Sequence, residues 1–183
     1  PESIIDAATI AQDATIVINN AATISYTPPL AEDALTQIQT EMQVNVYGLM
    51  QMAQSFAPIL KANGGGIFCQ MNATSSLRSM EALSTYAASK AASFSLTQAL
   101  RAPLGAQGTH VLSVHPGPVL TGMIASRTDL NIAEVATPEQ IALAIIESME
   151  AKEFLCYPDD KAKSLGQVYR PFSDYVFEEG NKY

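Results

Sequence analysis

Short runs of β-branched and apolar residues alternate along this chain with longer stretches of helical composition, and this alternation restricts the folds open to it. The runs cover residues 14–19, 67–71, 109–114 and 153–157. Apolar runs of four to eight residues that are bounded by turn residues are typical of buried strands. Strands that alternate with helices form a largely parallel sheet, so we predict an α/β fold.

Four helices are expected around these strands. They cover residues 1–8, with Pro1 in the first turn, then about 31–62, about 84–102, and about 138–149. Pro103 has no backbone N–H, so the third helix should kink or end there. The polar tail 158–183 should pack loosely against the same single domain, which spans 1–183.

The composition narrows the possible partners. Ten Lys and Arg against 18 Asp and Glu give a net charge of −8, without a basic cluster, which disfavours nucleic acid and anionic membranes. The chain has no apolar run long enough to span a bilayer and no secretory leader at its start. Cys69 and Cys156 are far apart in apolar runs and are expected to be buried, reduced thiols, which favours a cytoplasmic location. The sequence predicts no metal site.

One predicted helix carries a phenol and an ammonium four residues apart, in Tyr86-Ala-Ala-Ser-Lys90. At 3.6 residues per turn, the two side chains share one face and lie roughly 6 Å apart. A cation at that distance should lower the tyrosine pKa from about 10, and such a tyrosine can exchange a proton with an alcohol or carbonyl. The alternative is a chance pair on an ordinary helix.

Small and polar residues follow three of the predicted strands, at 19–22, 72–76 and 115–121. Ligands of parallel α/β sheets bind beyond the carboxyl ends of the strands, and small residues let a ligand approach the backbone. Each turn alone is also what an ordinary strand end looks like. Their recurrence beside the Tyr86 helix favours a binding site.

Together these motifs resemble the single-domain short-chain dehydrogenases/reductases. Asn19-Asn20-Ala21-Ala22 is similar to that family's Asn-Asn-Ala-Gly turn, and Asn45 to its helix asparagine. Tyr86-x-x-x-Lys90 is similar to its catalytic signature, and 116–121 to its Pro-Gly-x-x-x-Thr loop. The matches keep the family's order and run from the start of the chain to about residue 157. The resemblance implies a Rossmann-like, doubly wound, mostly parallel sheet.

The resemblance also implies NAD or NADP as cofactor and hydride transfer between a small-molecule alcohol and a carbonyl. Tyr86 would be the general acid/base, and Lys90 would bind the cofactor ribose and depress the tyrosine pKa. Asn45 would hold a water that links Lys90 to solvent, or make only a routine polar contact; Thr121 would bind the carboxamide, or cap a helix. The expected cofactor-binding residues are Asn20, Ala21, Ala22, Tyr86, Lys90, Pro116, Gly117, Val119 and Thr121. Members of the family pair through the two long helices, so a homodimer or homotetramer is expected.

The chain departs from the family pattern in three places. No glycine-rich turn follows a strand, so we expect the fold to be truncated on its N-terminal side, with an apolar sheet edge exposed. Ala73 falls where the family has its catalytic serine, and Thr74 or, preferably, Ser75 is the candidate substitute. Ala22 replaces a glycine. The alternative function is therefore a weakly active or inactive binding or scaffold protein with the same fold.

Overall fold

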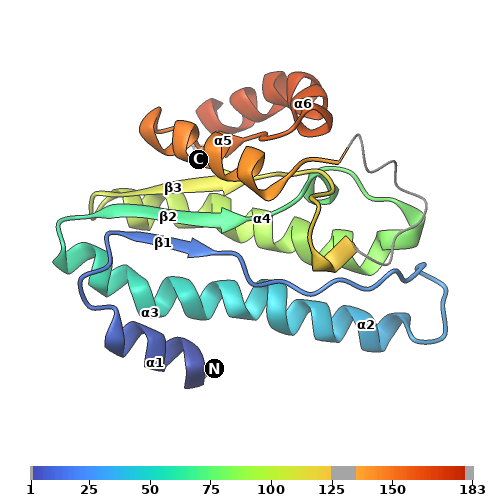
Figure 1. The fold of residues 1–183 in the computed structure, drawn as a ribbon, viewed down its shortest axis with the longest axis horizontal. Coiled ribbons are helices and arrows are strands. Elements are labelled where there is room, and N and C mark those ends of the chain that lie inside the picture. The colour runs from blue at the N-terminus through green and yellow to red at the C-terminus, as the bar shows by residue number, and fades with distance from the viewer. Residues whose placement is uncertain (1, 125–134, 180–183) are drawn as a thin grey trace.

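The computed structural model describes residues 2–124 and 135–179, so Pro1 and residues 180–183 lie outside the described residues. Within this part, four parallel strands form one sheet in the order β1-β2-β3-β4 (Figure 1). The strands are β1 (Ile16–Asn19), β2 (Gly66–Met71), β3 (Thr109–Val114) and β4 (Leu155–Cys156). The predicted α/β fold with a parallel sheet is confirmed.

Helices cover both faces of the sheet, as in a doubly wound fold. Figure 1 shows α1 (Glu2–Ile10) and α3 (Gly48–Ala62) below the sheet and α5 (Pro138–Glu150) above it. One core joins the sheet to α1, α3 and α4 (Ser84–Gly105), and a second joins it to α5. A third cluster packs α6 (Asp160–Glu179) beside β4 and against Phe94 of α4.

The predicted helix over 31–62 is present but not regular. It consists of α2 (Ala34–Glu41), a π-helical segment η1 (Met42–Tyr47) and α3. It ends at a run of three glycines with positive φ, and a Cβ at Gly66 would collide with the Thr15 carbonyl oxygen. The glycines therefore let the chain turn directly from α3 into β2.

The structure differs from the predictions at the end of one helix and in the tail. The helix α4 continues through Pro103 to Gly105 and so does not end at that proline, while a kink there stays a prediction. The tail does not pack loosely, because residues 160–179 form α6. Ala162 is fully buried and Ser173 is 1% exposed, so α6 is part of the packed structure.

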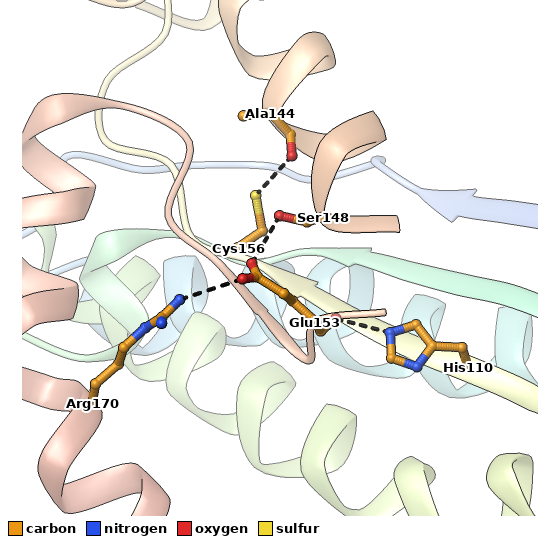
Figure 2. A network of polar contacts seen from close by, with 6 residues as sticks. All are labelled: His110, Ala144, Ser148, Glu153, Cys156 and Arg170. Atoms are coloured by element: carbon orange, nitrogen blue, oxygen red, sulfur yellow. Dashed lines mark hydrogen bonds and ion pairs between the residues drawn. The ribbon is translucent and has the colours of Figure 1, made fainter. Parts of the chain in front are cut away.

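A polar network fastens the chain between α5 and α6 (Figure 2). The backbone oxygen of Glu153 accepts a hydrogen bond from His110 Nε2 at 2.8 Å, and its carboxylate accepts one from Ser148 Oγ at 3.3 Å. Arg170 of α6 lies 3.9 Å from the same carboxylate, at a half-exposed position. One residue thus contacts β3, α5 and α6.

The strand β1 forms an edge of the sheet, and its two faces differ. Val17 is buried against α3, whereas Ile16 and Ile18 are 52% and 50% exposed. This is the exposed apolar edge that the sequence predicts. None of the helices in the described ranges is long and apolar enough to cross a bilayer.

Candidate active site

The three sequence motifs at strand ends meet at one edge of the sheet. Asn19 pairs with Gln70, and Met71 pairs with Val114, so β1, β2 and β3 end at nearly the same level. The segments that follow these strands line one cavity of about 1400 Å³. Of the predicted site residues, these line it: Asn20, Ala21, Ala22, Ser75, Tyr86, Lys90, Pro116, Gly117, Val119 and Thr121. Asn45 is the predicted site residue that does not.

Tyr86 and Lys90 lie in the first turns of α4, on the face that contacts this cavity. Both are buried, at 8% and 2% exposure. The Lys90 Nζ lies 5.8 Å from the centroid of the Tyr86 ring, close to the separation that the four-residue spacing predicts. The same Nζ donates a hydrogen bond of 2.8 Å to the Met71 carbonyl oxygen at the end of β2. The lysine thereby connects the helix to the sheet.

The prediction that Lys90 lowers the pKa of Tyr86 is wrong for this structure. Burial raises the pKa of Tyr86, and the neighbouring Glu41 and Tyr26 raise it further. The physical reason is that the phenol has lost the water that would stabilise its anion, while a carboxylate lies nearby. Tyr86 therefore stays protonated at neutral pH.

Lys90 itself is perturbed in the direction that burial dictates. Loss of hydration lowers the pKa of its amine from 10.5 to about 8. An ammonium has three N–H donors, and in the described part of the chain this one has a single acceptor, the Met71 oxygen. A buried amine with donors to spare on a cavity wall is suited to binding hydroxyl groups of a ligand.

Asn45 is buried in η1, and its side chain makes three hydrogen bonds within the protein. Its Oδ1 accepts from the Thr23 N–H, and its Nδ2 donates to the Thr23 oxygen and to Ser89 Oγ, each at 2.9 Å. The amide therefore ties the segment after β1 to α4. These contacts make Asn45 a structural clamp at the back of the site.

Glu41, one helical turn before Asn45, extends the same clamp and was missed from the sequence. It is fully buried, and its Oε1 accepts from the Ser25 N–H at 2.7 Å. Its Oε2 has no hydrogen-bond partner within residues 2–124 and 135–179. A lone glutamate in a helix of mixed composition carries no sequence signal of burial.

The segment after β2 places a hydroxyl group in the cavity wall near the alanine that replaces the expected serine. Ala73 is extended and buried, and the 3₁₀ turn η2 (Thr74–Ser76) follows it. Ser75 is 8% exposed and lines the cavity. Its Oγ has no hydrogen-bond partner among the residues that the structure describes. Ser75 is thus the hydroxyl group free to meet a ligand.

His115 holds this turn to the end of β3. Its Nδ1 lies 2.8 Å from Ser76 Oγ and 3.2 Å from the Ala73 oxygen, and its Nε2 lies 2.8 Å from Ser113 Oγ. Because the Ala73 oxygen is only an acceptor, Nδ1 carries the proton. Burial lowers the pKa of His115 to about 4, so the ring is neutral. This role carries no signal in the sequence, although the histidine directly precedes Pro116.

The loop after β3 is fixed at both ends. The Thr74 N–H donates to the Pro116 oxygen at 2.9 Å, and the Leu120 N–H donates to the Ala136 oxygen at 2.8 Å. Thr121 is exposed, and its hydroxyl donates weakly to the Val119 oxygen at 3.3 Å. In the described part of the chain, no three His, Cys, Asp or Glu side chains are grouped so as to hold a metal ion.

Comparison with known proteins agrees with the geometry. The family model described as short chain dehydrogenase matches residues 5–131, more than half of the chain. A short chain dehydrogenase from Burkholderia cenocepacia, solved in complex with NADP, has a TM-score of 0.84 and 26% identity. That likeness covers 97% of this chain and 73% of the other.

Two sequence relatives are named for an activity. The ketoacyl reductase HetN of Nostoc sp. is 28% identical over 140 residues, which is 75% of this chain and 48% of that protein. The 3alpha-hydroxysteroid dehydrogenase of Mediterraneibacter gnavus is 29% identical over 140 residues, 72% of this chain and 56% of that protein. The chain thus spans about half the length of these relatives.

Proposed function

We propose that this chain, which belongs to the short chain dehydrogenase family, carries the catalytic centre of an NAD(P)-dependent oxidoreductase that acts on an alcohol/carbonyl pair. The observation that carries the proposal is the position of Tyr86 and Lys90. Both are buried in one wall of the cavity that the three strand ends line. The family signature thus coincides with the place where parallel sheets bind ligands.

The residues present fit NAD or NADP. The spare donors of Lys90 suit the hydroxyl groups of a ribose, and the small side chains of Ala21 and Ala22 leave the backbone accessible from the cavity. When bound, the nicotinamide would supply or accept the hydride. We assign Asn20, Pro116, Gly117, Val119 and Thr121 to the same binding surface, with Thr121 facing the carboxamide.

Tyr86 is proposed as the proton donor to the substrate oxygen. Its raised pKa keeps the phenol protonated at neutral pH, so the O–H is available when a carbonyl becomes an alcohol. Ser75, whose buried Oγ lacks a partner in the described chain, is proposed to hold the same substrate oxygen. Asn45 is proposed to support proton supply to Lys90 from behind, through a bound water.

The lining of the cavity favours an apolar substrate. Beyond Tyr86 the wall consists largely of apolar side chains, which come from the segment before α4, from η4 (Gly122–Ile124) and from α6. They include Met80, Leu83, Met123, Leu165 and Val168. A carbonyl compound of medium size with a hydrocarbon body fits such a wall.

A homodimer or homotetramer is proposed from the outer face of the long helix. Val44, Tyr47 and Met50 are 38%, 51% and 42% exposed there, at neighbouring turns. Large apolar side chains left partly exposed along one helix favour a protein partner. Cys69 and Cys156 are both free and buried, which favours a cytoplasmic location.

The test is a titration of the full chain with NADH and NADPH, followed by nicotinamide fluorescence, and then a screen of apolar ketones. Tyr86→Phe should retain dinucleotide binding within about threefold and lose at least about a hundredfold in turnover. Tyr175→Phe, which removes an exposed phenol of α6 that does not line the cavity, is the matched control. Turnover that survives in Tyr86→Phe would refute the mechanism.

A second candidate function is a non-catalytic binding or scaffold protein, which Ala73 favours. An alanine cannot polarise a carbonyl, and the proposal above depends on Ser75 taking over. If Ser75 does so, Ser75→Ala should lower turnover by about a hundredfold. If neither wild type nor Ala73→Ser turns over any ketone while a dinucleotide binds, the scaffold function is the better description.

A further inference from the structure

The loop that follows β3 has a single backbone donor at its start. Pro116 and Pro118 carry no N–H, so between His115 and Val119 the Gly117 N–H is the one amide able to donate. It donates to the Oδ2 of Asp159 at 2.7 Å. A side chain 42 residues further along the chain therefore satisfies this donor.

Asp159 also holds the first turn of α6. Its Oδ1 accepts from the Ala162 N–H at 2.9 Å, and its own backbone oxygen accepts from the Lys163 N–H at 2.7 Å. A side-chain oxygen that accepts a hydrogen bond from the backbone N–H three residues later is the pattern of a helix N-cap. A negative charge at this end of a helix is stabilising. One carboxylate thus binds the loop with one oxygen and the helix with the other.

Gly117 gives the carboxylate its room. A Cβ at Gly117 would lie 3.0 Å from Asp159 Oδ1, which is closer than a side chain would normally approach. Gly117 is not among the residues with positive φ, so its backbone conformation does not itself call for glycine. The glycine is explained by the close approach of Asp159.

The two elements that Asp159 joins both contribute to the cavity wall. Pro116, Gly117 and Val119 line it from the loop, and Leu165 and Val168 line it from α6. We propose that Asp159 is a positioning residue that clasps the loop to α6. The loop facing the cofactor and the helix facing the substrate then keep a fixed relation. The assignment of the loop to the cofactor and of α6 to the substrate rests on the proposed function, whereas the contacts of Asp159 with both elements do not.

The test compares Asp159→Asn with Asp174→Asn in the full chain. Asparagine offers one acceptor oxygen, so one of the two amides would face an N–H₂ group. Asp174 is an exposed residue of the same helix, and its substitution removes the same charge. Amide hydrogen exchange at Gly117 and Ala162 is measured by NMR, and NADH and NADPH are titrated by fluorescence.

In Asp159→Asn we expect exchange at the Gly117 or Ala162 amide to be at least about tenfold faster, and the dissociation constant of the better dinucleotide to rise about tenfold. Asp174→Asn should stay within about twofold on each measure. Exchange in the middle of α6, at Leu165 and Val168, should not change in either variant. Faster exchange at the Leu165 and Val168 amides would show that Asp159 only caps α6, and it would refute the proposal that Asp159 holds the loop to the helix.

Gly117→Ala provides a second, independent perturbation, because it keeps the carboxylate and displaces it. It should weaken dinucleotide binding in the same direction, and the double variant should be no weaker than Asp159→Asn alone. Unchanged exchange at both amides in Asp159→Asn overturns the proposal. Faster exchange with unchanged affinity overturns the coupling to the site. If wild type binds neither dinucleotide, the proposed function fails, and the exchange data alone decide on the clasp.

Discussion

Replacing Lys90 by methionine should change how the stability of the fold depends on pH. The Lys90 amine is 2% exposed, and burial lowers its pKa from 10.5 to about 8 in the folded chain. Between these two values the unfolded chain holds a proton that the folded chain has released. The free energy of unfolding contributed by Lys90 therefore rises as pH rises through this window.

The magnitude follows from the two pKa values. Each unit of pKa corresponds to about 1.4 kcal/mol, so the full effect is about 3 kcal/mol, and most of it develops between pH 7 and pH 10. Burial raises the pKa values of Tyr86 and Cys69. The free energy of unfolding that these two groups contribute therefore falls as pH rises above the pKa values they have in the unfolded chain. They are present in both chains and cancel in the difference.

The assay is urea unfolding of wild type and Lys90→Met at pH 7 and pH 10. The free energy of unfolding of wild type should rise by about 2–3 kcal/mol relative to that of the variant between these pH values. Lys61→Met, which removes an exposed lysine at the end of α3, controls for net charge. A gap between wild type and Lys90→Met that is constant within about 0.5 kcal/mol would show that burial does not destabilise this ammonium, and would refute the reasoning.

Further predictions concern the buried clamp and the core. Glu41→Gln keeps an acceptor for the Ser25 amide but removes a charge that raises the pKa of Tyr86. The alkaline fall in the rate of the proposed ketone reduction should therefore move to lower pH. An unmoved pH–rate profile would contradict this. Leu60→Ala removes a fully buried side chain of the α3 core and should cost about 2–5 kcal/mol in urea unfolding. Leu35→Ala, at a site 78% exposed, should cost less than about 0.5 kcal/mol, and equal losses would mean that α3 is not part of the cooperative core.

The strands and most of the helices could be predicted because local pattern decides them. The strand Thr109–Val114 lies between Gly108 and Pro116 and is almost wholly buried, so its apolar run and its flanking residues mark its bounds directly. The helix α6 was missed because Gly166 and Pro171 argue against a helix in a polar segment. Gly166 is needed there because a Cβ would collide with the Tyr157 ring, a contact between elements that no local pattern reveals.

The candidate site, too, could be predicted only where local spacing decides it. The spacing of Tyr86 and Lys90 predicted their common face and their separation. It could not reveal that the Lys90 amine binds the Met71 oxygen, or that Glu41 approaches Tyr86 from another helix. The predicted direction of the Tyr86 pKa shift was therefore wrong, because burial and contacts with distant parts of the chain determine that shift.

The π-helical segment η1 lets the long helix hold one residue more than a regular α-helix with the same total rotation. A turn of α-helix takes 3.6 residues, and the wider turn closed by i→i+5 hydrogen bonds takes about one more. Loss of one codon within Met42–Tyr47 would therefore let the segment close as ordinary α-helix without rotating α2 relative to α3. Glu41 would keep its orientation toward Ser25, and the side chains of α3 would keep their places. A frame-preserving deletion here would act on the π-helical turn alone, which is the turn that carries the buried Asn45.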